Sequence, residues 1–345
     1  MRRIGFFLWV GLWMVWLVGC GGGEETAVSP PQLTTTTNLT LPTLTPVALD
    51  GGKLRVVATT SIIGDVVAQV GGEAIELTTL MAAGQDPHSY QPGAGDLTAV
   101  ANAHIIFING WNLEEGLLDD LANIAEDAPL VPVSAGIEPL PINADADEHD
   151  HQAEADHADA EEHGHGAADP HVWFDPDHVE TWVRNIEQIL SQLDPANGDS
   201  YATNAADYVA QLEELAGYMN SQVASIPTEN RVLVTNHDAL GYFAHRYRFE
   251  VLGTVIPAAS TLAEPSATEL AALVRAMEAA KVCVLFAETT ASGQLETAVA
   301  SELDTCETVQ ILTLYTGAIG PVGSGADSYI GMMQANVETL VAGLQ

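Results

Sequence analysis

Residues 54–72 read LRVVATTSIIGDVVAQVGG and show the repeating unit of the chain. The apolar run 54–60 predicts a buried strand, and Ser61 is placed to cap the helix that follows. Gly71-Gly72 ends this helix, and a second strand is expected over residues 75–81. The apolar residues of the helix share one face: Ile62, Ile63, Val66, Val67 and Val70. The segment is therefore a strand–helix–strand unit, which is typical of a parallel sheet.

The same alternation continues along most of the chain, on both sides of a central helical region. Further strands are expected at residues 104–108, 130–133, 231–235, 250–256, 282–287 and 309–314. Further helices are expected at residues 96–103, 114–125, 239–247, 267–280, 294–303 and 329–344. Alternating strands and helices predict two mostly parallel sheets, each covered by helices on both faces.

Two helical stretches, residues 179–193 and 195–223, lie between the halves. Pro195 stands where a first helical turn tolerates proline, and the second stretch would be about 43 Å long at about 1.5 Å per residue. We therefore predict an α/β fold of two lobes, each a mostly parallel sheet flanked by helices, joined by a long rigid backbone helix. The expected bounds are 53–194 for the N-terminal lobe, 195–224 for the linking helix and 229–345 for the C-terminal lobe.

The N-terminus has the features of a bacterial export signal. Arg2 and Arg3 precede an almost wholly apolar run over residues 4–18, and Cys20 follows a small residue at its end. This arrangement resembles the lipobox of lipoproteins, with residues 1–19 as signal peptide and Cys20 as the lipidated residue; an ordinary secretory signal or a short membrane anchor is the alternative. Residues 20–52 are rich in Thr and Pro and are expected to form a disordered tether.

The composition restricts the possible partners. The 345 residues include 47 Asp and Glu against 10 Lys and Arg, so the formal net charge is −37. Such an acidic chain is unsuited to nucleic acid or anionic lipid as its main partner, because both are densely negative. Hydrophobic residues make up 47% of the chain, which is enough for packed cores. Only three cysteines are present, too few for a disulfide scaffold.

An acidic, histidine-rich insert interrupts the α/β pattern over residues 143–168. It holds five of the eleven histidines of the chain, mixed with Asp, Glu and Ala, and it has no apolar face. We expect a disordered accessory loop that attracts metal ions, and a merely solvated acidic insert is the alternative. The histidines concerned are His149, His151, His157, His163 and His165.

Three other histidines occupy similar places at the ends of expected strands or the starts of helices. They are His88, His171 and His237. Ligands of open α/β sheets bind beyond the carboxyl ends of the strands, where loops bring distant residues together. Three imidazoles and one carboxylate would satisfy the tetrahedral coordination of Zn²⁺. A lone histidine is more often structural, which is the interpretation kept for His104, His178 and His245.

From residue 54 onwards the chain resembles the metal-specific solute-binding proteins of bacterial ABC transporters, and within them the zinc branch (ZnuA-like). The motifs that carry the resemblance are Asp86-Pro87-His88-Ser89-Tyr90, Asp169-Pro170-His171-Val172-Trp173, Asn236-His237-Asp238, Phe286-Ala287-Glu288 and Asp327-Ser328-Tyr329. The resemblance implies that His88, His171 and His237 bind the metal. It favours zinc over manganese, because the manganese branch typically has a carboxylate at the third position.

The fourth ligand is predicted to be a carboxylate. The Asp-Ser-Tyr motif resembles that of relatives in which this Asp coordinates, which points to Asp327. Glu288, at the end of an expected strand, is the second choice. Cys283 and Cys306 flank neighbouring strands and could form a disulfide in an oxidising compartment.

Together these features predict a receptor that binds Zn²⁺ outside the cytoplasm and is anchored to the cell membrane by lipid on Cys20. Its expected partners are an ABC-transporter permease and the cytoplasmic ATPase of that permease, and we expect a monomer. The alternatives are a manganese or iron receptor of the same class and a zinc-dependent hydrolase with His₃ coordination. A role in cell adhesion rests on surface exposure alone.

Overall fold

The computed structural model describes residues 38–125, 128–142 and 168–345. All described residues belong to one compact unit. The predicted signal peptide, Cys20 and the five histidines of the insert lie outside the described residues. Among the described residues, no helix combines the length and the apolar character needed to cross a bilayer.

The first sheet has four parallel strands in the order β2-β1-β3-β4. Its strands are β1 (Leu54–Ala58), β2 (Ile75–Thr79), β3 (Ile105–Ile108) and β4 (Leu130–Pro132). The helices that accompany it are α1 (Ser61–Gly71), α2 (Ala94–Ala101) and α3 (Leu118–Ile124).

The second sheet repeats this plan, with four parallel strands in the order β6-β5-β7-β8. Its strands are β5 (Val232–His237), β6 (Glu250–Ile256), β7 (Val284–Glu288) and β8 (Gln310–Leu314). The accompanying helices are α6 (Gly241–Tyr247), α7 (Ala267–Ala280), α8 (Gln294–Ser301) and α9 (Tyr329–Leu344). The two-lobed α/β prediction is confirmed.

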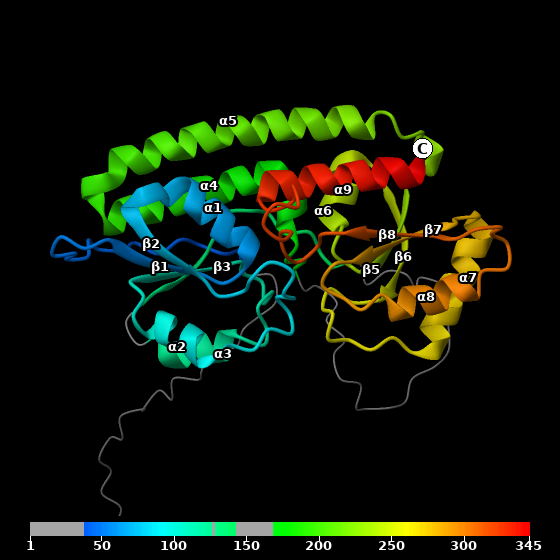
Figure 1. Ribbon diagram of the computed structural model, residues 1–345, viewed down its shortest axis with the longest axis horizontal. Coiled ribbons are helices and arrows are strands. Elements are labelled where there is room, and N and C mark those ends of the chain that lie inside the picture. The colour runs from blue at the N-terminus through cyan, green and yellow to red at the C-terminus, as the bar shows by residue number, and fades with distance from the viewer. Residues whose placement is uncertain (1–37, 126–127, 143–167) are drawn as a thin grey trace, which may run out of the picture. The chain divides into compact units, whose positions relative to one another are not determined.

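Two long helices, α4 (Pro176–Leu193) and α5 (Gly198–Val223), connect the sheets. Figure 1 shows α5 running past α1 and α4 at one end and α9 at the other, and α5 packs against all three helices. Buried residues recur along α5 every three or four positions: Tyr201, Ala205, Tyr208, Leu212, Leu215 and Met219. This spacing gives one apolar face, so α5 supports both lobes as a rigid backbone helix.

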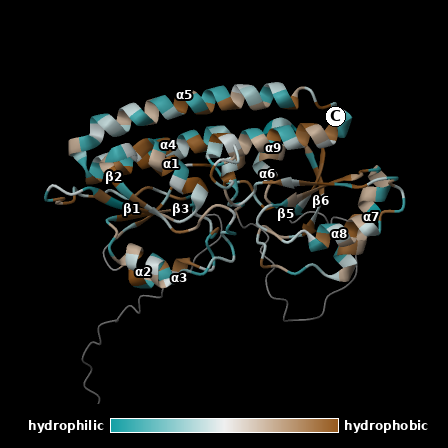
Figure 2. Ribbon diagram, in the orientation of Figure 1, coloured by the Kyte–Doolittle hydropathy of each residue, from teal (hydrophilic) through white to brown (hydrophobic). Residues whose placement is uncertain are grey.

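One hydrophobic cluster continues from the first lobe through the long helices into the second. It includes Ile63 of α1, Trp182 of α4, Leu212 of α5, Phe243 of α6 and Met332 of α9. The opposite face of each sheet has its own smaller cluster. Figure 2 shows the corresponding distribution, with largely apolar strands and polar residues interspersed along α5. A shared core of this kind favours small relative motions of the lobes over a wide hinge.

The predicted tether extends too far, because residues 38–49 pack against the folded body. Leu41, Leu44 and Val47 are partly buried against the main cluster. The amide of Val47 donates to the Leu193 carbonyl at 2.9 Å, and the amide of Leu44 donates to Gln192 Oε1 at 2.8 Å. These three apolar residues are spaced three positions apart. The Thr- and Pro-rich composition concealed this pattern.

Two local predictions about helix starts are also corrected. Thr60, rather than Ser61, is the N-cap of α1, and its side chain accepts from the amide of Ile63 at 3.1 Å. Helix α3 begins at Leu118 rather than at residue 114. Glu114 is instead buried, and its carboxylate accepts from Thr59 Oγ1 at 2.6 Å and from the Asn109 amide at 2.7 Å. This side chain stabilises the loop after β3 instead of opening a helix.

The structure joins Cys283 and Cys306 by a disulfide across Cα atoms 5.7 Å apart. Cys283 directly precedes β7, and Cys306 lies in the connection that leads to β8. Because β7 and β8 are parallel neighbours, their starting ends lie side by side. The bridge therefore ties the two strands at the edge of the sheet opposite their carboxyl ends.

Candidate metal centre

Three imidazoles from remote parts of the chain meet in one buried cluster. His88 lies in the loop after β2, His171 precedes the short 3₁₀ turn Val172–Phe174 that leads to α4, and His237 is the last residue of β5. The Nε2 atom of His171 is 3.3 Å from that of His88 and 3.2 Å from that of His237. Each of the three residues is at most 3% exposed. These are the three histidines that the sequence singled out.

Two of these rings are oriented by buried carboxylates. The Nδ1 atom of His171 donates to Asp169 Oδ1 at 2.8 Å, and Nδ1 of His237 donates to Glu288 Oε1 at 2.5 Å. A proton on Nδ1 leaves the Nε2 lone pair of a neutral ring free to bind a metal. Both lone pairs therefore point into the same small space. Two acceptors that face each other at 3.2 Å repel unless a cation or a proton lies between them.

The electrostatics of the cluster depend on burial. Burial and the two neighbouring rings lower the pKa of His88 to about 3, and burial lowers the pKa of His171 well below its usual value. Burial also raises the pKa of the Asp169 carboxyl to about 7. His88 and His171 thus favour the neutral form that coordinates metals, and a bound cation would offset the cost of ionising Asp169.

The pair formed by His237 and Glu288 behaves differently. Burial opposes a charge on His237, but the adjacent Glu288 carboxylate, together with the charges of Asp86 and Asp238, raises the pKa of the imidazole overall. Burial likewise opposes ionisation of Glu288, while attraction to His237 lowers its pKa overall. A metal ion that binds Nε2 of His237 must therefore displace any proton held there.

The spacing of the Nε2 atoms suits a single small cation. Zinc binds imidazole at about 2.0–2.1 Å, and tetrahedral angles then separate the nitrogens by about 3.3–3.4 Å. The two separations in the structure, 3.2 and 3.3 Å, are close to this value. Among the described residues, these three histidines form the group of His, Cys, Asp and Glu side chains with converging ligand atoms.

The predicted fourth ligand is not brought to this group. Asp327 is exposed, and its Oδ2 accepts from the amide of Gly323 at 2.7 Å. Asp327 directly precedes Ser328, the N-cap of α9, so its side chain turns back to the preceding glycine-rich loop. Glu288, the second choice, lies at the cluster, but it contacts the far nitrogen of His237 and Thr316 Oγ1. It therefore lies behind the ring of His237 and not on the side where the Nε2 atoms converge.

The sequence prediction assigned no role to Asp169, although this residue opens the Asp-Pro-His motif that contains His171. Its Oδ1 accepts from the backbone amide of His171 at 2.9 Å as well as from the ring. An Asp two residues before a histidine commonly accepts from the backbone in this way, which could have indicated it. Tyr242 was also missed: its hydroxyl donates to the Asp169 carbonyl at 2.9 Å and accepts from the Leu140 amide at 3.0 Å.

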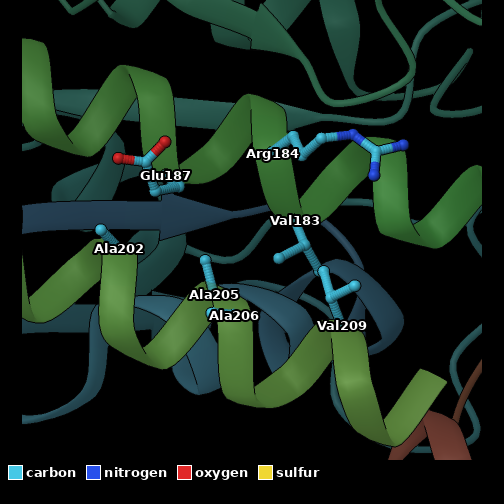
Figure 3. A pocket seen from close by; sticks show the side chains of 7 residues that line it. All are labelled: Val183, Arg184, Glu187, Ala202, Ala205, Ala206 and Val209. Carbon is cyan, nitrogen blue, oxygen red and sulfur yellow. The ribbon is translucent and has the colours of Figure 1, made fainter. Parts of the chain in front are cut away.

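A pocket away from the histidines lies between α4 and α5. Figure 3 shows it lined by the small or apolar side chains of Val183, Ala202, Ala205, Ala206 and Val209, with Arg184 and Glu187. It holds a single carboxylate and no imidazole, so it has no set of metal ligands.

Comparison with known proteins agrees with this geometry. A family model described as "ZnuA: Zinc-uptake complex component A periplasmic" matches residues 56–343, which include all three histidines. The manganese-binding lipoprotein MntA of Halalkalibacterium halodurans is 32% identical over 295 residues, covering 86% of this chain and 90% of that protein. The zinc-binding protein TroA of Treponema pallidum is 32% identical over 298 residues, covering 85% of this chain and 89% of that protein.

Solved structures show the same fold. The periplasmic zinc-binding protein TroA of Treponema pallidum superposes with a TM-score of 0.72 at 30% identity, covering 85% of this chain and 99% of that one. A manganese-bound mutant of a periplasmic metal-binding protein from Candidatus Liberibacter asiaticus gives a TM-score of 0.72 at 26% identity. That match covers 85% of this chain and 100% of the other. Proteins named for zinc and for manganese thus share this architecture.

Proposed function

Because the chain belongs to the ZnuA family of metal-binding components of ABC transporters, we propose that it captures Zn²⁺ outside the cytoplasm and delivers it to a membrane permease. The chain is a substrate-binding protein and not an enzyme, so the hydrolase alternative is removed. In this proposal His88, His171 and His237 bind the transported ion through Nε2, and Asp169 and Glu288 orient two of the rings. Lipid on Cys20 holds the protein at the membrane.

The observation that carries the zinc assignment is the convergence of three imidazole nitrogens at 3.2 and 3.3 Å. Imidazole suits zinc, whereas manganese prefers oxygen-rich coordination. In the described cluster the nearest carboxylates, Asp169 and Glu288, contact Nδ1 atoms and leave the Nε2 side to nitrogen alone. The histidine-rich insert would add weak sites that raise the local zinc concentration.

Manganese is the second candidate, since relatives such as MntA and PsaA are named for it. In vitro affinity alone does not separate the two ions, because zinc generally binds N and O ligands more tightly than manganese. The informative measurement is the metal content of the protein purified from its native envelope, by elemental analysis. We expect one tightly held zinc per chain, with further zinc bound weakly and removed by dialysis. Manganese as the main tightly held ion would overturn the zinc assignment.

Two variants are compared in the same experiment, one that removes a proposed ligand and one that serves as a control. His237→Ala removes one of the three nitrogens and should lose the tightly held ion. His245→Ala changes an exposed histidine of α6 in the same lobe and should retain it. Retention of the ion by His237→Ala would place the tight site elsewhere in the chain.

A further inference from the structure

His88 differs from the other two rings in having no hydrogen-bond partner on its second nitrogen. Its Nδ1 is buried, and among the described residues it makes no hydrogen bond. A buried polar atom left unpaired costs free energy, and metal-binding histidines nearly always donate from the second nitrogen. The arrangement around His88 is therefore incomplete in this structure.

One carboxylate lies close enough to complete it. Glu115 Oε1 is 3.8 Å from Nδ1 of His88, just beyond hydrogen-bond distance, and its side chain is 30% exposed. This same oxygen accepts a hydrogen bond from the hydroxyl of Ser260. Ser260 lies in the loop after β6, in the other lobe, 145 residues further along the chain. The Glu115 oxygen that lies nearest His88 thus already accepts a hydrogen bond from the second lobe.

The neighbouring contacts show that this is a junction between the lobes. Thr261 Oγ1 donates to Asp86 Oδ2 at 2.6 Å, and Asp86 Oδ1 accepts from the backbone amide of His88 at 3.0 Å. A Cβ atom on Gly317, in the loop after β8, would lie 2.7 Å from Pro87 Cδ. The segment that carries His88 is therefore in contact with two loops of the second lobe.

We propose that Glu115 is a positioning residue for His88 and that Ser260 competes with His88 for its carboxylate. A cation on Nε2 makes Nδ1–H a stronger donor, so metal binding draws Glu115 from Ser260 to His88 and completes the third carboxylate–histidine pair. Occupancy of the site is thereby coupled to one hydrogen bond between the lobes. This inference rests on the proposed function, since it assumes that His88 binds the transported ion.

The test compares variants of the purified full chain by Zn²⁺ competition against a chromophoric chelator. Glu115→Gln should weaken zinc binding by about 10–100-fold, the usual effect of losing such a partner. Ser260→Ala frees Glu115 and should bind zinc several-fold more tightly than the wild type, whereas Thr261→Val should not. Thr261→Val is the matched control, because it removes a neighbouring interlobe hydroxyl without touching Glu115.

The gain of Ser260→Ala over the wild type should vanish when Glu115→Gln is also present. Equal or weaker binding by Ser260→Ala, or a difference that persists beside Glu115→Gln, would overturn the competition. Nitrogen NMR of zinc-loaded protein adds a direct readout: His88 Nδ1–H should exchange slowly in the wild type and rapidly in Glu115→Gln, and equal exchange would contradict the contact. Absence of zinc binding by the wild type and Thr261→Val would instead refute the proposed function itself.

Discussion

The tripeptide Asp-Pro-His occurs twice in the cluster, at residues 86–88 and 169–171. In both copies the histidine amide donates to the Asp Oδ1, at 3.0 and 2.9 Å. In the second copy, Asp169 also accepts from the ring of its own histidine. In the first copy, Asp86 Oδ2 accepts instead from the hydroxyls of Ser89 and Thr261. The same local turn therefore holds one ring firmly and leaves the other without a carboxylate.

Burial accounts for the difference. Asp169 is 4% exposed and is enclosed by α6, where a Cβ on Gly241 would lie 2.7 Å from its Oδ2. Asp86 is only partly buried and has hydroxyl donors within reach. An Asp-Pro-His sequence fixes the backbone turn through the short Asp side chain, but the surroundings decide which donors the carboxylate takes. Under the proposed function, the comparison implies that His171 is a preorganised ligand and that His88 is an adaptable one.

The largest effect is expected from His171→Ala. His171 is within 3.3 Å of both other Nε2 atoms, so its loss removes the central ligand of the three. We expect the dissociation constant for Zn²⁺ to rise by more than about 100-fold. This exceeds the usual effect of losing a residue that only hydrogen-bonds a metal ligand. Chelator competition measures it, with exposed His245→Ala as the control. Loss of a residue that only hydrogen-bonds a metal ligand usually costs at least about tenfold in affinity. A smaller change would contradict the role of His171 as a preorganised ligand.

A smaller effect is expected from Asp169→Asn. The amide oxygen of Asn can still accept from the His171 backbone, but the charge that orients and polarises the ring is lost. Zinc affinity should fall by about 10–100-fold. Isothermal titration with a competing chelator would measure this change, and circular dichroism would verify the fold. Unaltered affinity would show that Asp169 is a turn residue only.

The smallest effect is expected from Asp86→Asn, the same substitution in the other copy. Asp86 contacts the backbone of His88 and not its ring. Zinc affinity should therefore fall by no more than a few-fold, because weakening one hydrogen bond costs about 1 kcal/mol. The same titration applies, and Asp169→Asn is the matched reference. If both Asn variants lost affinity equally, the distinction between a preorganised and an adaptable ligand would be wrong.

Much of the fold could be predicted because each element carries its own periodicity. The apolar face of α1 and the strand before it identified a parallel α/β unit, and the repetition of this unit identified two lobes. The packing of residues 38–49 was missed because Leu41, Leu44 and Val47 are scattered among Thr and Pro. Their burial depends on contacts with other parts of the chain.

For the candidate site, the structure brings the three predicted histidines together, but it places the two carboxylates elsewhere than on the side where the Nε2 atoms converge. Asp327 was chosen from its motif, yet the start of α9 turns it toward Gly323. Glu288 was considered as a ligand, but it contacts the far nitrogen of His237. Motif identity cannot say which of the two ring nitrogens a carboxylate will meet, because that depends on the relative placement of two strands.

Sequence patterns were sufficient to predict the alternation of strands and helices and the two lobes, because these follow from local spacing, capping and turns, which act over a few residues. The three histidines were predicted from the resemblance of their motifs to those of a known family. The roles of Asp169 and Glu288 in orienting rings, and the contact of Ser260 with Glu115, became visible only in the folded chain. Ser260 and Glu115 are 145 residues apart, and His237 and Glu288 are 51 apart. Packing brings such distant groups together and removes the water that would otherwise compete for them.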